Sequence, residues 1–300
     1  MKTTLVTGST DGIGLRTALE LADSGHAVVL HGRNAEKVQR ARDIIQRAAP
    51  DAVLHTAHAD LADLAAVALM AQDLAARLPK LDVLVNNAGV YMTGRRVSKD
   101  GFEMTLAVNY LAHFLLTVLL LPLLKKSSDP RVVTVSSIAH TRGNIDFSNM
   151  NGERHFDAYH AYANSKLADT LFANELARRE PWLASNSLHP GVIDTKLLHT
   201  GFDAKGDSVA AGACTRCTSP PHPILKVSLE NISINAPLCD LRRWRKISAW
   251  RSNCGSGRKT PCGLFAAMRF RHTRAKKQET LGKKTISSTV LSHKGFPIAS

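Results

Sequence analysis

The sequence predicts an α/β fold in three layers, a doubly wound parallel sheet with helices on both faces. Short runs of apolar and β-branched residues alternate with helical patterns over the first 190 residues, which is typical of successive βαβ units. A glycine-rich segment directly follows the first of these runs. The same region is electrically balanced, with 22 basic and 22 acidic side chains in residues 1–213. These observations indicate one folded domain of ordinary globular composition.

The elements can be placed in order along the chain. Strands are predicted at 3–7, 27–31, 53–58, 81–86, 131–136 and 185–189. Helices are predicted at 14–24, 35–48, 63–77, about 102–126 and 161–179. The longest apolar run, 114–124, has 11 residues, whereas a membrane-spanning helix needs roughly 20. We interpret this run as a core helix and expect no transmembrane segment. The first strand begins almost at Met1 and leaves no room for a signal peptide, so we expect a cytoplasmic protein.

The composition changes abruptly after residue 213. All of the net charge of +14 lies in residues 214–300, as do all five cysteines (Cys214, Cys217, Cys239, Cys254 and Cys262). Prolines at 220, 221 and 223 interrupt the helical pattern. We predict a domain over 1–213 and an irregular, basic, poorly ordered tail over 214–300. The leading hypothesis is that the tail is foreign to the fold, for example read in another frame, which translation of the other two frames would test.

A second interpretation gives the tail a purpose as a basic arm for nucleic acid or an anionic membrane. Such an arm would present clustered cations or aromatic side chains spaced for stacking. Trp244 and Trp250, which stand among five basic residues, are the only such feature. We therefore expect no nucleic-acid partner.

The first predicted turn has the residues of a dinucleotide-binding site. Its sequence, Thr7 to Gly14, places three glycines between a strand and a helix. Gly8 permits the turn, Gly12 lets the backbone approach a pyrophosphate, and Gly14 lets the helix pack closely on the strand. The helix N-terminus then offers N–H groups to the phosphates. We predict a Rossmann-like site with contacts from Gly8, Ser9, Thr10, Gly12, Ile13 and Gly14.

The end of the second predicted strand indicates which dinucleotide binds. An NAD site usually has a carboxylate here for the ribose 2′-hydroxyl, and residues 30–34 contain none. Arg33 stands there instead, beside Asn34, and a guanidinium pairs well with a 2′-phosphate. A solvated arginine at the start of a helix is the alternative interpretation. We predict that NADP(H) is preferred over NAD(H).

Tyr162 and Lys166 form the candidate acid–base pair. Residues four apart lie on one face of a helix. A free phenol has a pKa of about 10 and is a poor base at neutral pH, and a nearby ammonium favours its phenolate form. Tyr159 is the rival, but the residue four positions after it is Ala163. The pair could exchange a proton with a substrate oxygen while hydride moves at carbon.

With these motifs, the chain resembles the short-chain dehydrogenase/reductase superfamily and is most similar to its retinol-dehydrogenase-like branch. Seven motifs follow one another in the family's order over about 190 residues. Beyond the glycine turn and the Tyr–Lys pair, the matching segments are Asp60-Leu61, Asn86-Asn87-Ala88-Gly89, residues 108–114 with Asn109, residues 135–137 with Ser137, and His189-Pro190-Gly191-Val192 with Thr195.

The resemblance implies a role for each matching residue. Tyr162 would donate a proton to the carbonyl oxygen in reduction and accept one in oxidation. Ser137 would hydrogen-bond that oxygen. Lys166 would hold the nicotinamide ribose and favour the phenolate. Asn109 would support a water that links Lys166 to solvent. The remaining predicted cofactor contacts are Asp60, Leu61, Asn87, Ala88, Gly89, Pro190, Gly191, Val192 and Thr195.

The segment before the catalytic pair indicates the substrate class. The interval from Ser137 to Tyr162 is 25 residues and contains a polar, irregular stretch at 142–157. In the retinol-dehydrogenase-like branch, a similar insert lies beside the substrate cleft, so the resemblance implies a lipophilic aldehyde, ketone or alcohol. The family often dimerises through helices, and a homodimer is compatible with this sequence.

Three other interpretations follow from the same residues. A related enzyme could reduce a carbon–carbon double bond with the same tyrosine and lysine. An altered C-terminus could leave a protein that binds NADP(H) without turnover. The 13 histidines and the pair Cys214-x-x-Cys217 could suggest a metal site, but the histidines are scattered and the other cysteines stand singly. We therefore predict no metal site.

Overall fold

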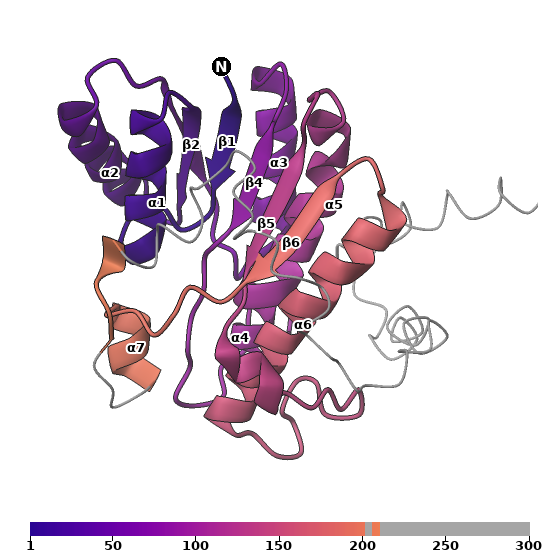
Figure 1. Ribbon diagram of the computed structural model, residues 1–300. Helices are drawn as coiled ribbons and strands as arrows, with labels where there is room; N and C mark the ends of the chain where they lie inside the picture. Colours follow the sequence, from indigo (N-terminus) through magenta and orange to yellow (C-terminus); the bar gives the residue numbers. More distant parts are fainter. Residues whose placement is uncertain (202–205, 211–300) are drawn as a thin grey trace, which may run out of the picture. The chain divides into compact units, whose positions relative to one another are not determined.

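The computed structural model describes residues 1–201 and 206–210, which contain one six-stranded parallel sheet (Figure 1). The strands lie in the order β3-β2-β1-β4-β5-β6. Their bounds are β1 (Thr3–Val6), β2 (Ala27–Gly32), β3 (Leu54–His58), β4 (Val83–Asn86), β5 (Arg131–Val135) and β6 (Ala184–Leu188). The strand order reverses between β1 and β4, and sheets of this kind bind ligands at the carboxyl ends beside such a reversal.

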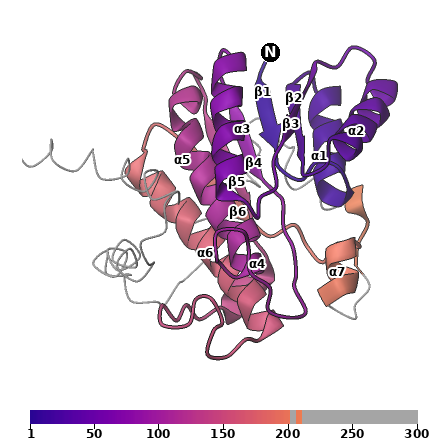
Figure 2. The same ribbon diagram turned by 180° about the vertical axis from the view of Figure 1, so that it is seen from behind.

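Helices cover both faces of the sheet, as a parallel sheet requires. Their bounds are α1 (Gly12–Asp23), α2 (Ala35–Ala48), α3 (Leu64–Arg77), α4 (Met104–Leu106), α5 (Ala112–Leu124), α6 (Ala158–Arg179) and α7 (Lys196–Gly201). Helix α1 packs against α2 and lies in front of the sheet in Figure 1, whereas α3 packs against α5 and lies in front in the reverse view of Figure 2. Phe114 of α5 meets Phe172 of α6 with ring centroids 5.4 Å apart.

The predicted fold class and every predicted strand and helix are confirmed, with shifted boundaries. Helix α1 begins at Gly12 rather than residue 14, because the Asp11 side chain caps it. Helix α6 begins at Ala158 rather than residue 161, because the Asp157 side chain accepts a hydrogen bond from the His160 N–H. Both predictions started the helix at its periodic apolar residues and missed the cap.

The helix predicted at 102–126 is a composite. It consists of α4, a π-helical turn (Ala107–Leu111) and α5. The helical run Met104–Leu124 has 21 residues and a mean hydropathy of 1.9, long and apolar enough to cross a membrane by length and composition. The 11-residue apolar run therefore does not by itself exclude a membrane span, since the helix continues through polar residues. Of the apolar window, 61% is buried inside the protein, as in the core helix of a globular domain.

The chain divides into two units, Met1–Val227 and Ser228–Ser300, and every described residue belongs to the first. The tail predicted at 214–300, with its cysteines and tryptophans, lies outside the described residues. Both interpretations of the tail therefore stay predictions.

Candidate active site

The glycine turn joins the carboxyl end of β1 to the start of α1 and has little steric freedom. Gly8 and Gly12 have positive φ, 65° and 53°, a conformation that other residues rarely adopt. A Cβ on Gly14 would lie 2.2 Å from the Gly8 carbonyl oxygen, and a Cβ on Gly8 would lie 2.9 Å from the Ala88 Cα. The turn is therefore pressed against both its own helix and the loop after β4.

Side chains that we did not predict hold this turn in place. The Thr7 hydroxyl oxygen accepts hydrogen bonds from the backbone N–H groups of Asn87 (2.8 Å) and Ala88 (3.0 Å), and it lies 2.9 Å from His113 Nε2. His113 Nδ1 lies 2.8 Å from the Asn109 carbonyl oxygen. Burial lowers the pKa of His113 to about 3, so the ring is neutral. It can then accept from Thr7 and donate to Asn109, which links the turn to the π-helical turn.

The residues of the glycine turn that we predicted as cofactor contacts differ in how deeply they are buried. Ser9 is fully buried, and its hydroxyl accepts a hydrogen bond from the His31 N–H at 2.8 Å. Its backbone N–H also donates to the His31 carbonyl oxygen, at 2.9 Å, so both the side chain and the N–H of Ser9 bind β2. The Gly8 N–H lies 3.1 Å from His31 Nδ1. Thr10 and Ile13 are half-buried beside the turn.

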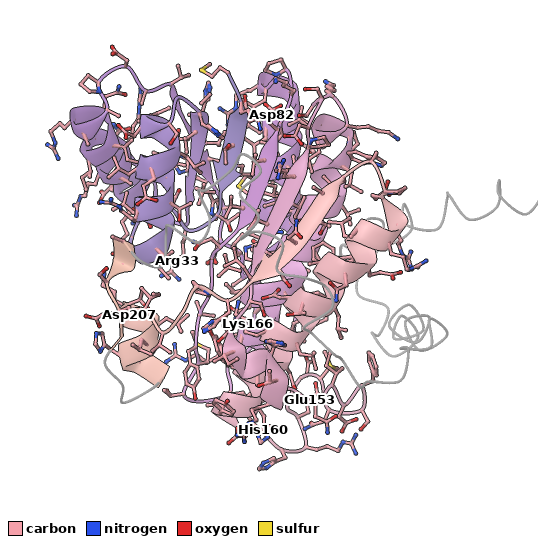
Figure 3. The ribbon with its side chains drawn as sticks, viewed as in Figure 1. Arg33, Asp82, Glu153, His160, Lys166 and Asp207 are labelled. Atoms are coloured by element: carbon pink, nitrogen blue, oxygen red, sulfur yellow. The ribbon has the colours of Figure 1, made fainter. Side chains whose placement is uncertain are left out.

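At the end of β2, Arg33 is exposed, and Figure 3 shows it at the same end of the sheet as Lys166. No hydrogen bond or ion pair joins Arg33 to another residue of the described part of the chain. The predicted contact Asn34 instead caps α2, because its side chain accepts from the Lys37 N–H at 3.2 Å. In the segment after β3, Asp60 is exposed and Leu61 is buried.

Helix α6 brings Tyr162 and Lys166 to the carboxyl ends of the strands. Tyr162 is 6% exposed and packs with Ala139, which lies two residues after Ser137. The centroid of the Tyr162 ring lies 5.5 Å from the centroid of the Tyr91 ring and 5.9 Å from the Lys166 ammonium nitrogen. Ser137 follows β5, is half-buried, and accepts a hydrogen bond from the Ala139 N–H at 3.2 Å.

The Lys166 ammonium is almost completely buried and donates hydrogen bonds to a backbone carbonyl and to a carboxylate. It donates to the Val135 carbonyl oxygen at 2.8 Å and to Asp169 Oδ2 at 2.9 Å. The two side chains of the ion pair are 4% and 1% exposed. Sequence reasoning missed Asp169. The spacing Lys-x-x-Asp on a helix was the available signal, but it is common on solvated faces, and only burial distinguishes this pair.

Asn109 lies in the π-helical turn, a feature that often marks functional sites. Its side chain is fully buried and makes three hydrogen bonds. Oδ1 accepts from the Val90 N–H at 2.8 Å, and Nδ2 donates to the Val90 carbonyl oxygen at 3.1 Å and the Ser165 hydroxyl at 3.0 Å. Asn109 therefore ties the loop after β4, which carries Gly89, to helix α6.

The segment after β6 lies over the glycine turn. A Cβ on Gly12 would be 3.6 Å from the Thr195 methyl group, and Lys196 forms an ion pair with Asp11. Leu197 packs against the cluster of buried residues Ala139, Tyr162 and Ala163. It also lies 3.8 Å from a Cβ built on Gly89. Predicted contacts Pro190, Gly191 and Val192 lie before this point, with Gly191 at φ 93° and Val192 46% exposed. The structure thus brings Thr195 of the predicted nicotinamide loop to the glycine turn, and Leu197, two residues later, to Tyr162.

The insert between β5 and α6 forms a cavity of about 210 Å³ against the start of α6. Leu106, Met150 and Phe156 give it apolar walls, and Asn164 and His160 add polar groups. Within residues 1–201 and 206–210, no group of three or more His, Cys, Asp or Glu side chains is placed to hold a metal ion.

Comparison with known proteins gives one family. The model of the short chain dehydrogenase family matches residues 2–206. Retinol dehydrogenase 13 from Homo sapiens is 43% identical over 205 residues, which are 67% of this chain and 62% of that protein. Polyprenol dehydrogenase from Mus musculus is 43% identical over 208 residues, 66% of this chain and 62% of that protein. The match therefore spans less than two thirds of these relatives' length.

A solved structure agrees with the fold. A short chain dehydrogenase from Shigella flexneri 2a, complexed with NADP, has a TM-score of 0.58 and 27% identity. The likeness covers 70% of this chain and 86% of that one.

Proposed function

The chain belongs to the short chain dehydrogenase family, and from this membership we propose that it is an NADP(H)-dependent oxidoreductase interconverting a carbonyl and an alcohol on a lipophilic substrate. One observation carries the proposal. A buried tyrosine lies beside a buried ammonium at the carboxyl ends of the strands, the same edge of the sheet at which the tight Gly8–Gly14 turn follows β1. The site residues would be Asn109, Ser137, Tyr162 and Lys166.

The residues present fit a dinucleotide. The backbone from Gly8 to Gly14 leads into the N-terminus of the 12-residue helix α1, where N–H groups and the positive end of the helix dipole favour a phosphate. Arg33 would pair with the 2′-phosphate of NADP(H), since it is exposed and no carboxylate precedes it at the end of β2. The NADP complex of the Shigella relative supports this cofactor. The further contacts would come from the segments 60–61, 87–89 and 190–195.

The side chains can then act on the substrate oxygen. When bound, the nicotinamide supplies a hydride to the carbonyl carbon or removes one from the alcohol. Tyr162 would donate its hydroxyl proton to the carbonyl oxygen in reduction and take it back in oxidation. Ser137 would donate a hydrogen bond to the same oxygen. Lys166 would favour the phenolate by its positive charge and would hold the nicotinamide ribose.

A lipophilic substrate is proposed on two grounds. The two relatives are named for retinol and polyprenol, which are long-chain lipid alcohols. Leu197 and Tyr91 pack around Tyr162, so the reacting oxygen would sit among apolar groups that exclude water. The cavity with walls from Leu106, Met150 and Phe156 would lie beside the chain of such a substrate.

Replacing Tyr162 by phenylalanine tests this proposal. The matched control is Tyr159→Phe, the same change about one turn earlier on α6. Tyr159 packs against the cluster of buried residues that includes Tyr162. With NADPH and a panel of hydrophobic aldehydes and ketones, we expect Tyr162→Phe to lose about 10²- to 10⁴-fold in kcat/KM, the usual contribution of a general acid. NADPH affinity should stay within about threefold, and Tyr159→Phe should retain activity.

The opposite pattern would exclude the assignment. Equal losses in the two variants, or full activity in Tyr162→Phe, would contradict a role for Tyr162 as proton donor. NADPH binding by the wild-type protein without turnover of any carbonyl would instead indicate a non-catalytic protein.

A further inference from the structure

We infer that Asp169 is a positioning residue: it holds the Lys166 ammonium in place and offsets its charge, so that Tyr162 reaches its basic form at a higher pH than a lone lysine would give. This inference deepens the proposed function and rests on it. It adds a residue to the catalytic helix that the family motifs of this chain do not include.

The Lys166 ammonium is held by hydrogen bonds to two buried acceptors. Lys166 has three N–H donors, and two of them go to the Val135 carbonyl oxygen and to Asp169 Oδ2, at 2.8 and 2.9 Å. Asp169 lies three residues after Lys166 on α6, and both side chains are buried. Because a buried lysine cannot rotate into water, these two bonds determine where its charge sits relative to the Tyr162 ring.

The surroundings leave Lys166 as the only cation beside this carboxylate in the described part of the chain. Asp169 Oδ1 is buried and has no hydrogen-bond partner among the described residues. Tyr110, from the π-helical turn, faces Asp169 and is buried, and the pKa of its phenol is raised by burial and by this carboxylate. His113 of α5 faces Lys166 and is neutral. Ser136 and Thr170 hydrogen-bond to each other and to the Lys166 carbonyl oxygen instead.

The carboxylate is charged where the enzyme would work. Burial raises the pKa of Asp169 to about 6, against the opposing effect of Lys166, so the group is ionised at neutral and alkaline pH. A negative charge 2.9 Å from the ammonium cancels much of the positive potential that Lys166 exerts at Tyr162. The phenolate then gains less from Lys166, and the proton leaves Tyr162 at a higher pH.

Asp169→Asn separates charge from position, because an amide oxygen can still accept from Lys166 while the negative charge is removed. The matched control is Asp73→Asn, the same change at a half-exposed carboxylate that pairs with Arg77 on α3. We would measure kcat/KM for alcohol oxidation with NADP⁺ as a function of pH. The midpoint of the alkaline rise should fall by about one pH unit in Asp169→Asn and stay unchanged in Asp73→Asn.

A second readout does not depend on turnover. The chain has four tyrosines, and the ultraviolet absorbance of phenolate reports their ionisation in the protein without cofactor. Subtracting the titration of Tyr162→Phe, or of Tyr162→Phe/Asp169→Asn, isolates Tyr162 in each background. Its midpoint should be about one pH unit lower without the Asp169 charge. If the wild type lacks turnover, the proposed function fails, but this titration still decides the inference.

Equal midpoints in wild type and Asp169→Asn would overturn the inference, as would a shift of the same size in Asp73→Asn. If Asp169→Asn does not fold, Asp169→Glu replaces it. That variant keeps the charge and should keep the wild-type midpoint, and a midpoint lowered by about one pH unit there would equally overturn the inference.

Discussion

At the scale of single residues, the proposed preference for NADP(H) rests on the exposed cation at the end of β2. Arg33 has no ion pair or hydrogen bond to hold it within the described residues, whereas its neighbour Asn34 is used as a helix cap. A guanidinium that is not engaged in the protein is available to a ligand phosphate. The sequence alone predicted both as cofactor contacts, because a capping asparagine and a contacting one look the same before the backbone is known.

Arg33→Ala should weaken NADPH binding by about 10- to 100-fold and leave NADH binding within about threefold, since only the 2′-phosphate loses its partner. Arg42→Ala is the control, because Arg42 is also an exposed arginine of this region and lies on α2. Titration of nicotinamide fluorescence would measure both affinities. Equal weakening for the two cofactors, or no weakening, would show that Arg33 does not read the 2′-phosphate.

At the scale of elements, the start of helix α6, which carries Tyr162 and Lys166, depends on its N-terminal cap. The Asp157 side chain accepts from the His160 N–H at 2.7 Å and fixes where α6 begins, one turn before Tyr162. That hydrogen bond is the main reason that the pKa of Asp157 lies below its usual range. A carboxyl whose pKa is lowered on folding adds stability above its unfolded pKa, and this contribution disappears as the pH falls through the folded value.

Asp157→Ala should lower the free energy of unfolding by about 1 kcal/mol at neutral pH, the usual value of a cap, and by less below about pH 4. Asp51→Ala, at an exposed carboxylate that caps no helix, should have little effect. Denaturant unfolding followed by circular dichroism measures both. If the two variants lose the same stability at pH 7, the cap does not determine the start of α6.

Element prediction from the sequence succeeded where periodicity is strong and failed where side chains act on the backbone. All strands were found within two residues, because β-branched apolar runs bounded by loops define them. The starts of α1 and α6 were missed because Asp11 and Asp157 precede the periodic residues. The π-helical turn at Ala107–Leu111 has no periodic signal at all, yet it carries Asn109.

The candidate site shows the same division. Gly8, Gly14, Tyr162 and Lys166 could be predicted because backbone sterics or helix spacing restrict their residue types. Asp169 could not be predicted, since its effect depends on burial of both charges, which only the packed structure provides.

At the scale of the whole molecule, two buried histidines couple stability to pH. Burial lowers the pKa of His31 to about 4 and that of His113 to about 3. The unfolded chain binds protons near the ordinary value of 6.5, so the stability from these neutral rings is complete above pH 6.5. It is lost as the pH falls from 6.5 toward the folded values. Asp169, whose pKa is raised, opposes this loss over part of the range.

Stability should therefore fall with acid by up to about 1.4 kcal/mol per pH unit for each histidine below pH 6.5. His31→Gln should make the plot of unfolding free energy against pH less steep by the contribution of one histidine, because glutamine does not titrate. His58→Gln, at an exposed histidine, should leave the slope unchanged. Denaturant unfolding between pH 7.5 and 4.5 gives the slopes, and a wild-type stability that is flat over this range would contradict the neutral, buried state of both rings.

The most direct test of the central claim follows the hydride itself. NADPH with deuterium at the transferred position of the nicotinamide would be incubated with the protein and a hydrophobic enal, and the products examined by mass spectrometry and NMR. Carbonyl chemistry at Tyr162 predicts one deuterium on the new carbinol carbon, with the double bond intact and with label transfer by Tyr162→Phe slowed about 10²- to 10⁴-fold. Deuterium on the carbon chain beside an intact carbonyl, or no deuterium in any product, would contradict it.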